Sequence, residues 1–296
     1  MNSSSLIGPL PKSLVGRGVP AVPTGSQAPM RWRGRVRSCV SEKHRRYSLL
    51  LPALLLCAIP LAWADDDTEA ARLIPFDSMT ASNRALVRAV TDHYTLRREY
   101  PAQEFRGRTA VFAYLLDHME SCSMLAQKLG LITYRATRTA DGRLYADDHE
   151  GATGYLLTAY ARDDKPSSPG KRVVYVEGTQ HGLFDVGGRG VAVVDYRQKT
   201  PDKIEYTRAA FVKVDNVVLA ALAQLFSVFL RGTVDSHFTH VLRNPVMLSE
   251  KAATKPQKLL DTIARMSAED QKSLATFTTL VRSNAIVRAA TRNQVE

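Results

Sequence analysis

A series of short β-type segments joined by short turns is the feature that most constrains this fold. Between Leu131 and Val214, stretches rich in β-branched and aromatic residues alternate with turn residues. Antiparallel strands can be joined by tight turns, whereas parallel strands need crossovers of about a dozen residues or more. The sequence therefore predicts an antiparallel sheet of about six strands, at 132–139, 144–148, 152–162, 171–178, 189–197 and 204–214.

Two glycine-containing sites are interpreted as turns between these strands. Asp141-Gly142 is a strong hairpin signal between two β-type segments. Gly187-Gly188 begins a Gly-Gly-Arg-Gly stretch that has the composition of a phosphate-binding loop. Because a predicted strand follows it, and not a helix, the stretch favours a turn.

Helical patterns flank the predicted sheet. Residues 68–100 form one helical region that ends at Pro101, and 108–129 form a second, with Gly130 placed to end it in a left-handed conformation. After the strands, 217–230 carries no charged side chain, yet it is shorter than the ~20 residues of a membrane span, so we expect a buried helix. This helix is predicted to continue to Arg243 and to stop before Pro245. Two further helices are expected at 256–266 and 268–283.

The element order predicts an α+β fold in which the long helix covers one face of the antiparallel sheet. From about Arg108 to Pro245, this order resembles the helix-grip fold of START-like proteins and polyketide cyclases, the SRPBCC superfamily. Members of that superfamily begin with a strand, for which Glu99–Phe105 is the candidate. The resemblance implies a sheet wrapped around a long C-terminal helix, here with extra N- and C-terminal helices. It also implies binding of a lipid or other hydrophobic molecule without catalysis.

The N-terminal part of the chain has the pattern of a secretory signal. A basic stretch at 43–46 precedes an apolar run from Leu49 to Trp63, which ends in Ala62-Trp63-Ala64. A basic segment, a short apolar segment and an A-x-A site define a cleavable signal peptide. The run is too short for a membrane anchor and contains two prolines. We therefore expect cleavage near Ala64 and a periplasmic or secreted protein.

These patterns divide the chain into five parts. Residues 1–39 have no hydrophobic period, and they are either a disordered leader or a stretch upstream of the true translation start. The signal peptide occupies 40–64. A helical segment at 65–107, a helix-grip-like domain at 108–245 and C-terminal helices at 246–296 are expected to follow.

The basic character of the chain comes mainly from its first 64 residues. The formal net charge is +11, but without those residues 31 basic and 28 acidic side chains remain. That is an ordinary surface without the clustered basic stripe that phosphate contacts require. We therefore expect no nucleic-acid partner, and no transmembrane segment in the mature protein. Cys122 alone remains after cleavage, so no internal disulfide can form.

Amphipathic and acidic residues in the strands are candidates for a ligand cavity. Val173, Tyr175 and Glu177 share one face of a predicted strand, as do Val191, Val193 and Asp195. If these faces line a cavity, the two acids have raised pKa values and can hold a polar head group or transfer a proton. The predicted lining is Tyr134, Tyr155, Tyr175, Glu177, Val193, Asp195, Tyr206, Leu222 and Phe226.

Two clusters contain residues that can ligate a metal, although we expect neither a metal nor another cofactor. Asp117, His118 and Glu120 lie close in sequence, with Cys122 four residues after His118. They are interpreted either as part of a thiol or metal site, or as a polar helix end with a buried cysteine. His237 and His240, near Asp235, lie three apart and lack the glutamate of an H-E-x-x-H motif.

Three hypotheses follow, in decreasing order of weight. The first is an exported binding protein that holds a hydrophobic small molecule or lipid between the sheet and helix 217–243. The second is a structural or partner-binding protein that docks through an exposed apolar patch on 256–283. The third is a hydrolase or cyclase, which requires at least three of the acids and histidines to converge at one cleft.

Overall fold

The computed structural model describes residues 66–131, 134–149, 151–181, 185–215 and 227–292. All of them belong to one compact unit, Ala62–Glu296. The predicted leader and signal peptide lie outside the described residues, as does 217–226 of the predicted long helix. None of the described helices is both long and apolar enough to cross a membrane.

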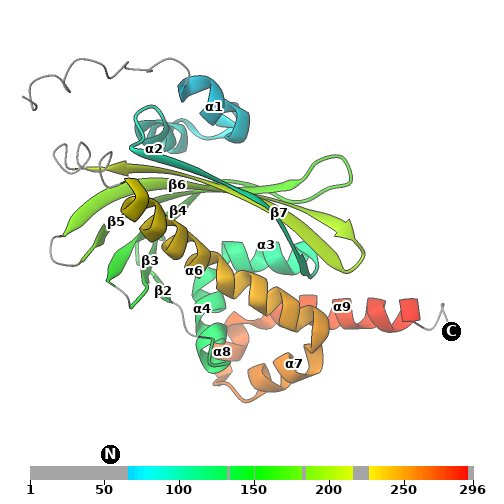
Figure 1. Ribbon diagram of the computed structural model, residues 1–296. Helices are drawn as coiled ribbons and strands as arrows, with labels where there is room; N and C mark the ends of the chain where they lie inside the picture. Colours follow the sequence, from blue (N-terminus) through cyan, green and yellow to red (C-terminus); the bar gives the residue numbers. More distant parts are fainter. Residues whose placement is uncertain (1–65, 132–133, 150, 182–184, 216–226, 293–296) are drawn as a thin grey trace, which may run out of the picture. The chain divides into compact units, whose positions relative to one another are not determined.

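Seven antiparallel strands form one open sheet in the order β1-β7-β6-β5-β4-β3-β2 (Figure 1). The predicted antiparallel arrangement is confirmed, with one strand more than the expected six. Gly142 has a φ of +83°, as the predicted Asp141-Gly142 hairpin requires. The strands are β1 (Leu96–Arg106), β2 (Arg135–Arg138), β3 (Leu144–Asp147), β4 (Ala152–Arg162), β5 (Gly170–Gln180), β6 (Val186–Thr200) and β7 (Lys203–Val214).

The additional strand, β1, corrects the prediction of a helix over 68–100. Helix α2 (Ala81–Thr91) ends at Thr91, and the chain then enters β1, which pairs with β7. The strand candidate at 99–105 lies within β1. Pro101 falls at a register shift between Tyr100 and Gln103. Because β1 is an edge strand, a proline there costs the sheet little. Pairing with a strand about a hundred residues away thus overrides the local helical pattern.

The prediction of a turn at Gly187-Gly188 is also wrong, because both glycines lie inside β6. Gly187 pairs with Thr179, and Gly188 pairs with Gly178, which in turn pairs with Gly154 on β4. A Cβ atom at Gly178 would lie 2.4 Å from the carbonyl oxygen of Thr153, and one at Gly154 would lie 2.5 Å from that of Glu177. Glycine here permits a close backbone approach and does not mark a turn.

Gly178→Ala is therefore expected to destabilise the protein by about 1–3 kcal/mol, since the new methyl group overlaps backbone that cannot move freely. Gly187→Ala is the matched control, because the nearest atom to its Cβ is Asp215 Oδ2 at 3.7 Å. The control should be neutral or gain up to about 1 kcal/mol from lower chain entropy in the unfolded state. Urea denaturation of the two variants measures both effects. Equal losses would contradict the close approach of β4 and β5.

The helices after β1 differ from prediction mainly in where they break. The region 108–129 forms α3 (Thr109–Asp117) and α4 (Met119–Lys128), which separate at His118. Gly130 has the expected left-handed φ of +69°. The predicted helix 268–283 is two helices, α8 (Ala268–Ser273) and α9 (Ala275–Arg292), and Ser267 caps α8 by accepting a hydrogen bond from Asp270 N. Helix α7 (Pro256–Ala264) lies close to the prediction of 256–266.

Helix α6 (Ser227–Thr254) continues through Pro245, where the sequence predicted an end. A proline inside a helix removes one hydrogen bond and crowds the preceding turn. Packing compensates on both sides of it, since Leu242 and Leu248 are both at most 4% exposed. Tertiary contacts supply most of the stability of a protein helix, so they can outweigh this local cost.

Helices pack on both faces of the sheet (Figure 1). Helices α1 (Asp66–Leu73) and α2, with a short 3-10 turn (Phe76–Ser78) between them, share a core with β4 to β7. Helices α3 and α6 share a second core with the other face. A third core joins α3, α4 and α6 to α7 and α9. We call the two sides of the sheet the α1–α2 face and the α6 face.

Candidate functional site

The two faces of the sheet are covered to different extents. On the α1–α2 face, Val173 of β5 and Val191 and Val193 of β6 are at most 1% exposed. On the α6 face, the neighbouring residues of the same strands, Val174 and Ala192, are only half-buried. Because successive side chains of a strand point to opposite faces, the cover at this level of the sheet differs between the faces. Further along β6, Val194 and Tyr196 of the α6 face are at most 3% exposed, so the α6 face is less covered over part of its length only.

Half-buried apolar side chains continue across the α6 face. Val174 pairs with Ala192, while Leu156 of β4 pairs with Val176 of β5, which pairs with Gly190 of β6. Residues 154, 178 and 188, one row further along, are the glycines described above. The α6 face therefore presents a continuous apolar strip with few large side chains.

A polar cluster joins β1 to α6 at the border of this strip. Arg98 donates to both carboxylate oxygens of Asp235, at 3.0 and 2.7 Å, and the Tyr100 hydroxyl donates to Oδ1 at 2.6 Å. The hydrogen bond from Arg98 lowers the pKa of Asp235. Burial, together with the hydrogen bond to Asp235, raises the pKa of Tyr100 to about 12. The cluster therefore holds α6 against the edge strand.

Arg208 of β7 lies beside this cluster. It pairs with Tyr100 on β1 and with Val194 on β6, so it belongs to the α6 face. Its guanidinium carbon lies 4.5 Å from the ring centroid of Tyr100 and 5.9 Å from that of Phe238 on α6. The two rings stack on each other, with centroids 5.5 Å apart, so a cation lies beside an aromatic pair at one end of the apolar strip.

The nine predicted lining residues do not share one surface. Tyr206 packs on the α6 face, whereas Tyr175 and Val193 pack against α1 and α2. Tyr134 is fully buried beside Val241 of α6. Leu222 and Phe226 lie outside the described residues.

The two predicted acids also lie on the α1–α2 side. Glu177 lies 3.0 Å from Arg143, and Tyr155 is its cross-strand partner. Asp195 accepts from Lys171 Nζ at 2.9 Å. The alternation predicted within each strand is correct, but it does not show which layer covers each face.

The Asp117 cluster does not converge on one site. Asp117 binds Arg172, His118 Nδ1 contacts the carbonyl oxygen of Tyr114 at 3.0 Å, and Glu120 pairs with Arg138. Cys122 is fully buried, and burial raises the pKa of its thiol to about 12. It therefore behaves as a small apolar side chain and not as an activated thiol.

The histidines of α6 have separate environments. His237 Nδ1 lies 2.7 Å from Asp148 Oδ2, between β3 and β4. Across the described ranges, no group of three or more His, Cys, Asp or Glu side chains is arranged to hold a metal ion. Nor do three of the predicted acids and histidines meet at one cleft in this part of the chain.

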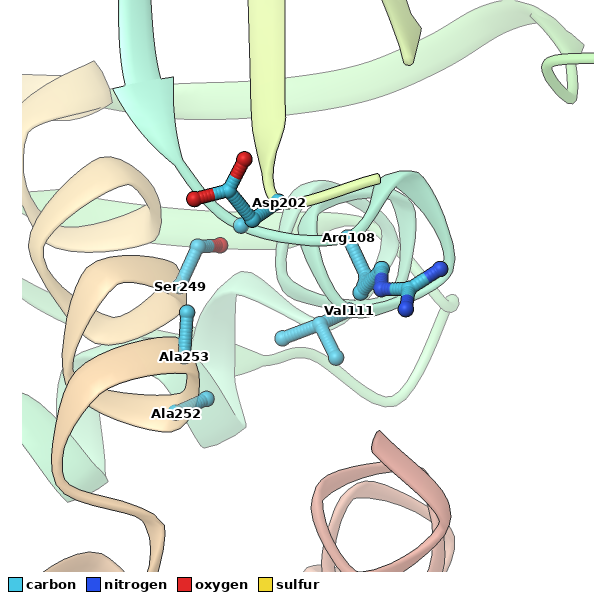
Figure 2. Close-up of a pocket in the computed structure, with 7 residues that line it drawn as sticks. Arg108, Val111, Asp202, Ser249, Ala252 and Ala253 are labelled. Atoms are coloured by element: carbon cyan, nitrogen blue, oxygen red, sulfur yellow. The ribbon is translucent and has the colours of Figure 1, made fainter. Parts of the chain in front are cut away.

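The C-terminal helices pack their apolar side chains inward. Leu259, Ile263, Phe277 and Val281 are at most 4% exposed, in one core with α3, α4 and α6. A small hollow of about 10 Å³ lies between α3 and α6, roughly the space of one water molecule. Figure 2 shows Ser249, Ala252 and Ala253 of α6 beside this hollow, with Val111 of α3 near them.

Sequence reasoning missed Arg98, Tyr100 and Arg208. The first two lie in the stretch predicted as a helix, and their partner Asp235 follows them by more than 130 residues. One signal was present, since Arg98 and Tyr100 are two residues apart and a strand places them on one face.

Comparisons with known proteins assign no family to this chain. Its sequence matches no family model, and a search of curated proteins finds no match. Among solved structures, a conserved protein from Geobacillus kaustophilus is 15% identical, with a TM-score of 0.34, over 51% of this chain and 95% of that one.

Two other solved structures give similar values. The di-domain ARO/CYC BexL of the BE-7585A biosynthetic pathway is 10% identical over 55% of this chain and 53% of its own, with a TM-score of 0.28. Dicamba monooxygenase bound to dicamba is 9% identical over 74% of this chain and 65% of its own, with a TM-score of 0.35. This chain therefore spans about half of BexL and about two thirds of the monooxygenase. Likenesses at this level assign no function.

Proposed function

We propose that this chain is an exported protein that binds a hydrophobic small molecule or lipid, without catalysis, between the α6 face of the sheet and helix 217–243. The observation that carries the proposal is the unequal cover of the two faces in the middle of β5 and β6. Val174 and Ala192 are half-buried on the α6 face, while Val173, Val191 and Val193 are closed off on the other. Ligand pockets are mostly apolar, with a few polar groups that orient the ligand.

The arrangement of α6 supports this proposal. The helix is attached to β1 through Asp235 and to the β3–β4 connection through His237. These contacts fix the helix at two places, and the apolar strip lies on the same face of the sheet. We include in the proposal the helix-grip arrangement that the element order resembles.

The partner-binding alternative has less support. It required an exposed apolar patch on 256–283, but the large apolar side chains described between 256 and 281 are buried or half-buried. The hydrolase or cyclase alternative required converging acids and histidines, which lie apart in the described residues.

The test uses the full chain, exported and purified from a bacterial host, and a neutral fluorescent probe, N-phenyl-1-naphthylamine. We expect saturable binding with enhanced fluorescence, and a co-purified apolar molecule in native mass spectra. Val174→Trp should weaken probe binding at least about tenfold by filling the strip, whereas Ala275→Trp, at an exposed position on α9, should leave it unchanged.

A clean ligand-free mass together with no saturable probe binding would reject the binding proposal. Equal effects of the two tryptophan variants would place the ligand elsewhere. The same intact mass tests export, since cleavage after Ala64 leaves Asp65 as the first residue.

A further inference from the structure

Two of the arginines on the α6 face, Arg172 and Arg98, have acidic partners. Arg172 binds Asp117 through two hydrogen bonds of 2.6 and 2.7 Å, and it also binds Asp163. Arg98 binds both oxygens of Asp235. The charges of these two arginines are therefore compensated.

Arg208 differs from them. No hydrogen bond or ion pair links its side chain to any of the described residues, and its Nε atom is buried without an acceptor. Its nearby carboxylate, Asp235, already accepts from Arg98 and Tyr100. The rings of Tyr100 and Phe238 lie near the guanidinium. They do not replace the oxygen acceptors that its N–H groups, which point outward in the guanidinium plane, require.

Within the described residues, Arg208 is thus partly buried without a hydrogen-bonded acid, beside an Asp235 that is already bound by Arg98. A buried cation is costly unless it is paired and hydrogen-bonded. The planar guanidinium fork matches the oxygens of a carboxylate or phosphate, and binding is stronger where water is partly excluded. We propose that Arg208 binds the acidic head group, a carboxylate or phosphate, of an amphipathic ligand whose apolar body lies along the α6 face. This inference rests on the proposed function and specifies its ligand class.

The register of the sheet sets the reach of such a ligand. Arg208 pairs with Val194, and Gly188 lies six residues earlier on the same strand. At about 3.3 Å per residue, the strip from Arg208 to the glycine row is roughly 20 Å long. Val174, Ala192 and Val176 lie between these ends. The strip therefore accepts an extended apolar chain, or fused rings, with one charged end.

The test measures displacement of N-phenyl-1-naphthylamine from the full chain by compounds with one tail and different head groups. Dodecanoate and dodecyl phosphate should displace the probe at least about tenfold better than dodecanol or dodecylamine. Inorganic phosphate should displace nothing, and the ratio of dodecanoate to dodecyl phosphate distinguishes the two head groups. Arg208→Met should abolish the acidic preference and leave dodecanol unchanged, while Arg208→Lys should retain part of it.

Arg135→Gln is the matched control, because Arg135 is an exposed arginine of β2 in the same sheet. The thermal midpoint of ligand-free Arg208→Met should stay within about 4 °C of the parent, the shift expected for about 1 kcal/mol. Probe binding without preference for acidic heads, or a preference that survives Arg208→Met, overturns the inference and leaves the proposed function standing. Absence of probe binding in the parent protein rejects the proposed function itself.

Discussion

Phe112→Ala is expected to lower the free energy of unfolding by about 3–5 kcal/mol, the largest effect of any single change considered for this protein. Phe112 lies on α3, is fully buried, and contacts the sheet through three rings. Its ring centroid lies 5.0 Å from that of Phe105, 5.5 Å from that of Tyr196 and 6.0 Å from that of Tyr206. Truncation removes these contacts and opens a cavity between α3 and the sheet, which the backbone of neither element can move to fill.

The effect is measured by urea denaturation followed by far-ultraviolet circular dichroism. The dependence of the unfolding free energy on urea concentration should match that of the parent protein. Tyr145→Ala serves as the control, since Tyr145 is a half-buried aromatic residue on β3 whose ring meets that of Tyr155. The control should cost about 0.5–1.5 kcal/mol, the range of an aromatic pair. A loss below about 1 kcal/mol for Phe112→Ala would contradict the packing of α3 on the sheet.

Arg172→Met is expected to cost about 3 kcal/mol, toward the lower end of the range for breaking a buried ion pair because both acidic partners keep contact with water. The Arg172 side chain is 3% exposed, whereas Asp117 and Asp163 are 33% and 72% exposed. Burial opposes the charged form of Arg172, but the hydrogen bonds to Asp117 and Asp163 outweigh it and raise the pKa. Methionine keeps the apolar stem and removes the charge. Asp117 then loses its partner at the C-terminal end of α3, where a negative charge is unfavourable.

Asp163→Asn is the matched change in the same network. Because Asp163 is mostly exposed, its loss should cost less than about 1 kcal/mol. The two single variants and the double variant form a cycle that isolates the coupling of Arg172 to Asp163. If Asp163→Asn proved as costly as Arg172→Met, the outer carboxylate and not the bond to α3 would carry the stability.

Part of the candidate site could be predicted from sequence, and part could not. The shared faces of Val173 and Tyr175, and of Val191 and Val193, follow from the two-residue period of strands, and the register pairs these residues across β5 and β6. The period cannot show which layer covers a face. The side carrying Glu177 and Asp195 therefore looked like a cavity lining, although α1 and α2 pack on it.

Sequence by itself determined the features that depend on neighbours along the chain. The antiparallel strands from β2 to β7, the hairpin at Gly142, the left-handed Gly130 and the cap at Ser267 all follow from local turn and capping chemistry. Only the tertiary structure decided the rest. Pairing with β7 made 96–106 a strand, packing carried α6 through Pro245, and the fold placed Arg208 beside Tyr100 and Phe238. Each of these depends on groups distant in the chain, whose contact energy outweighs local preference only after the sheet and helices have assembled.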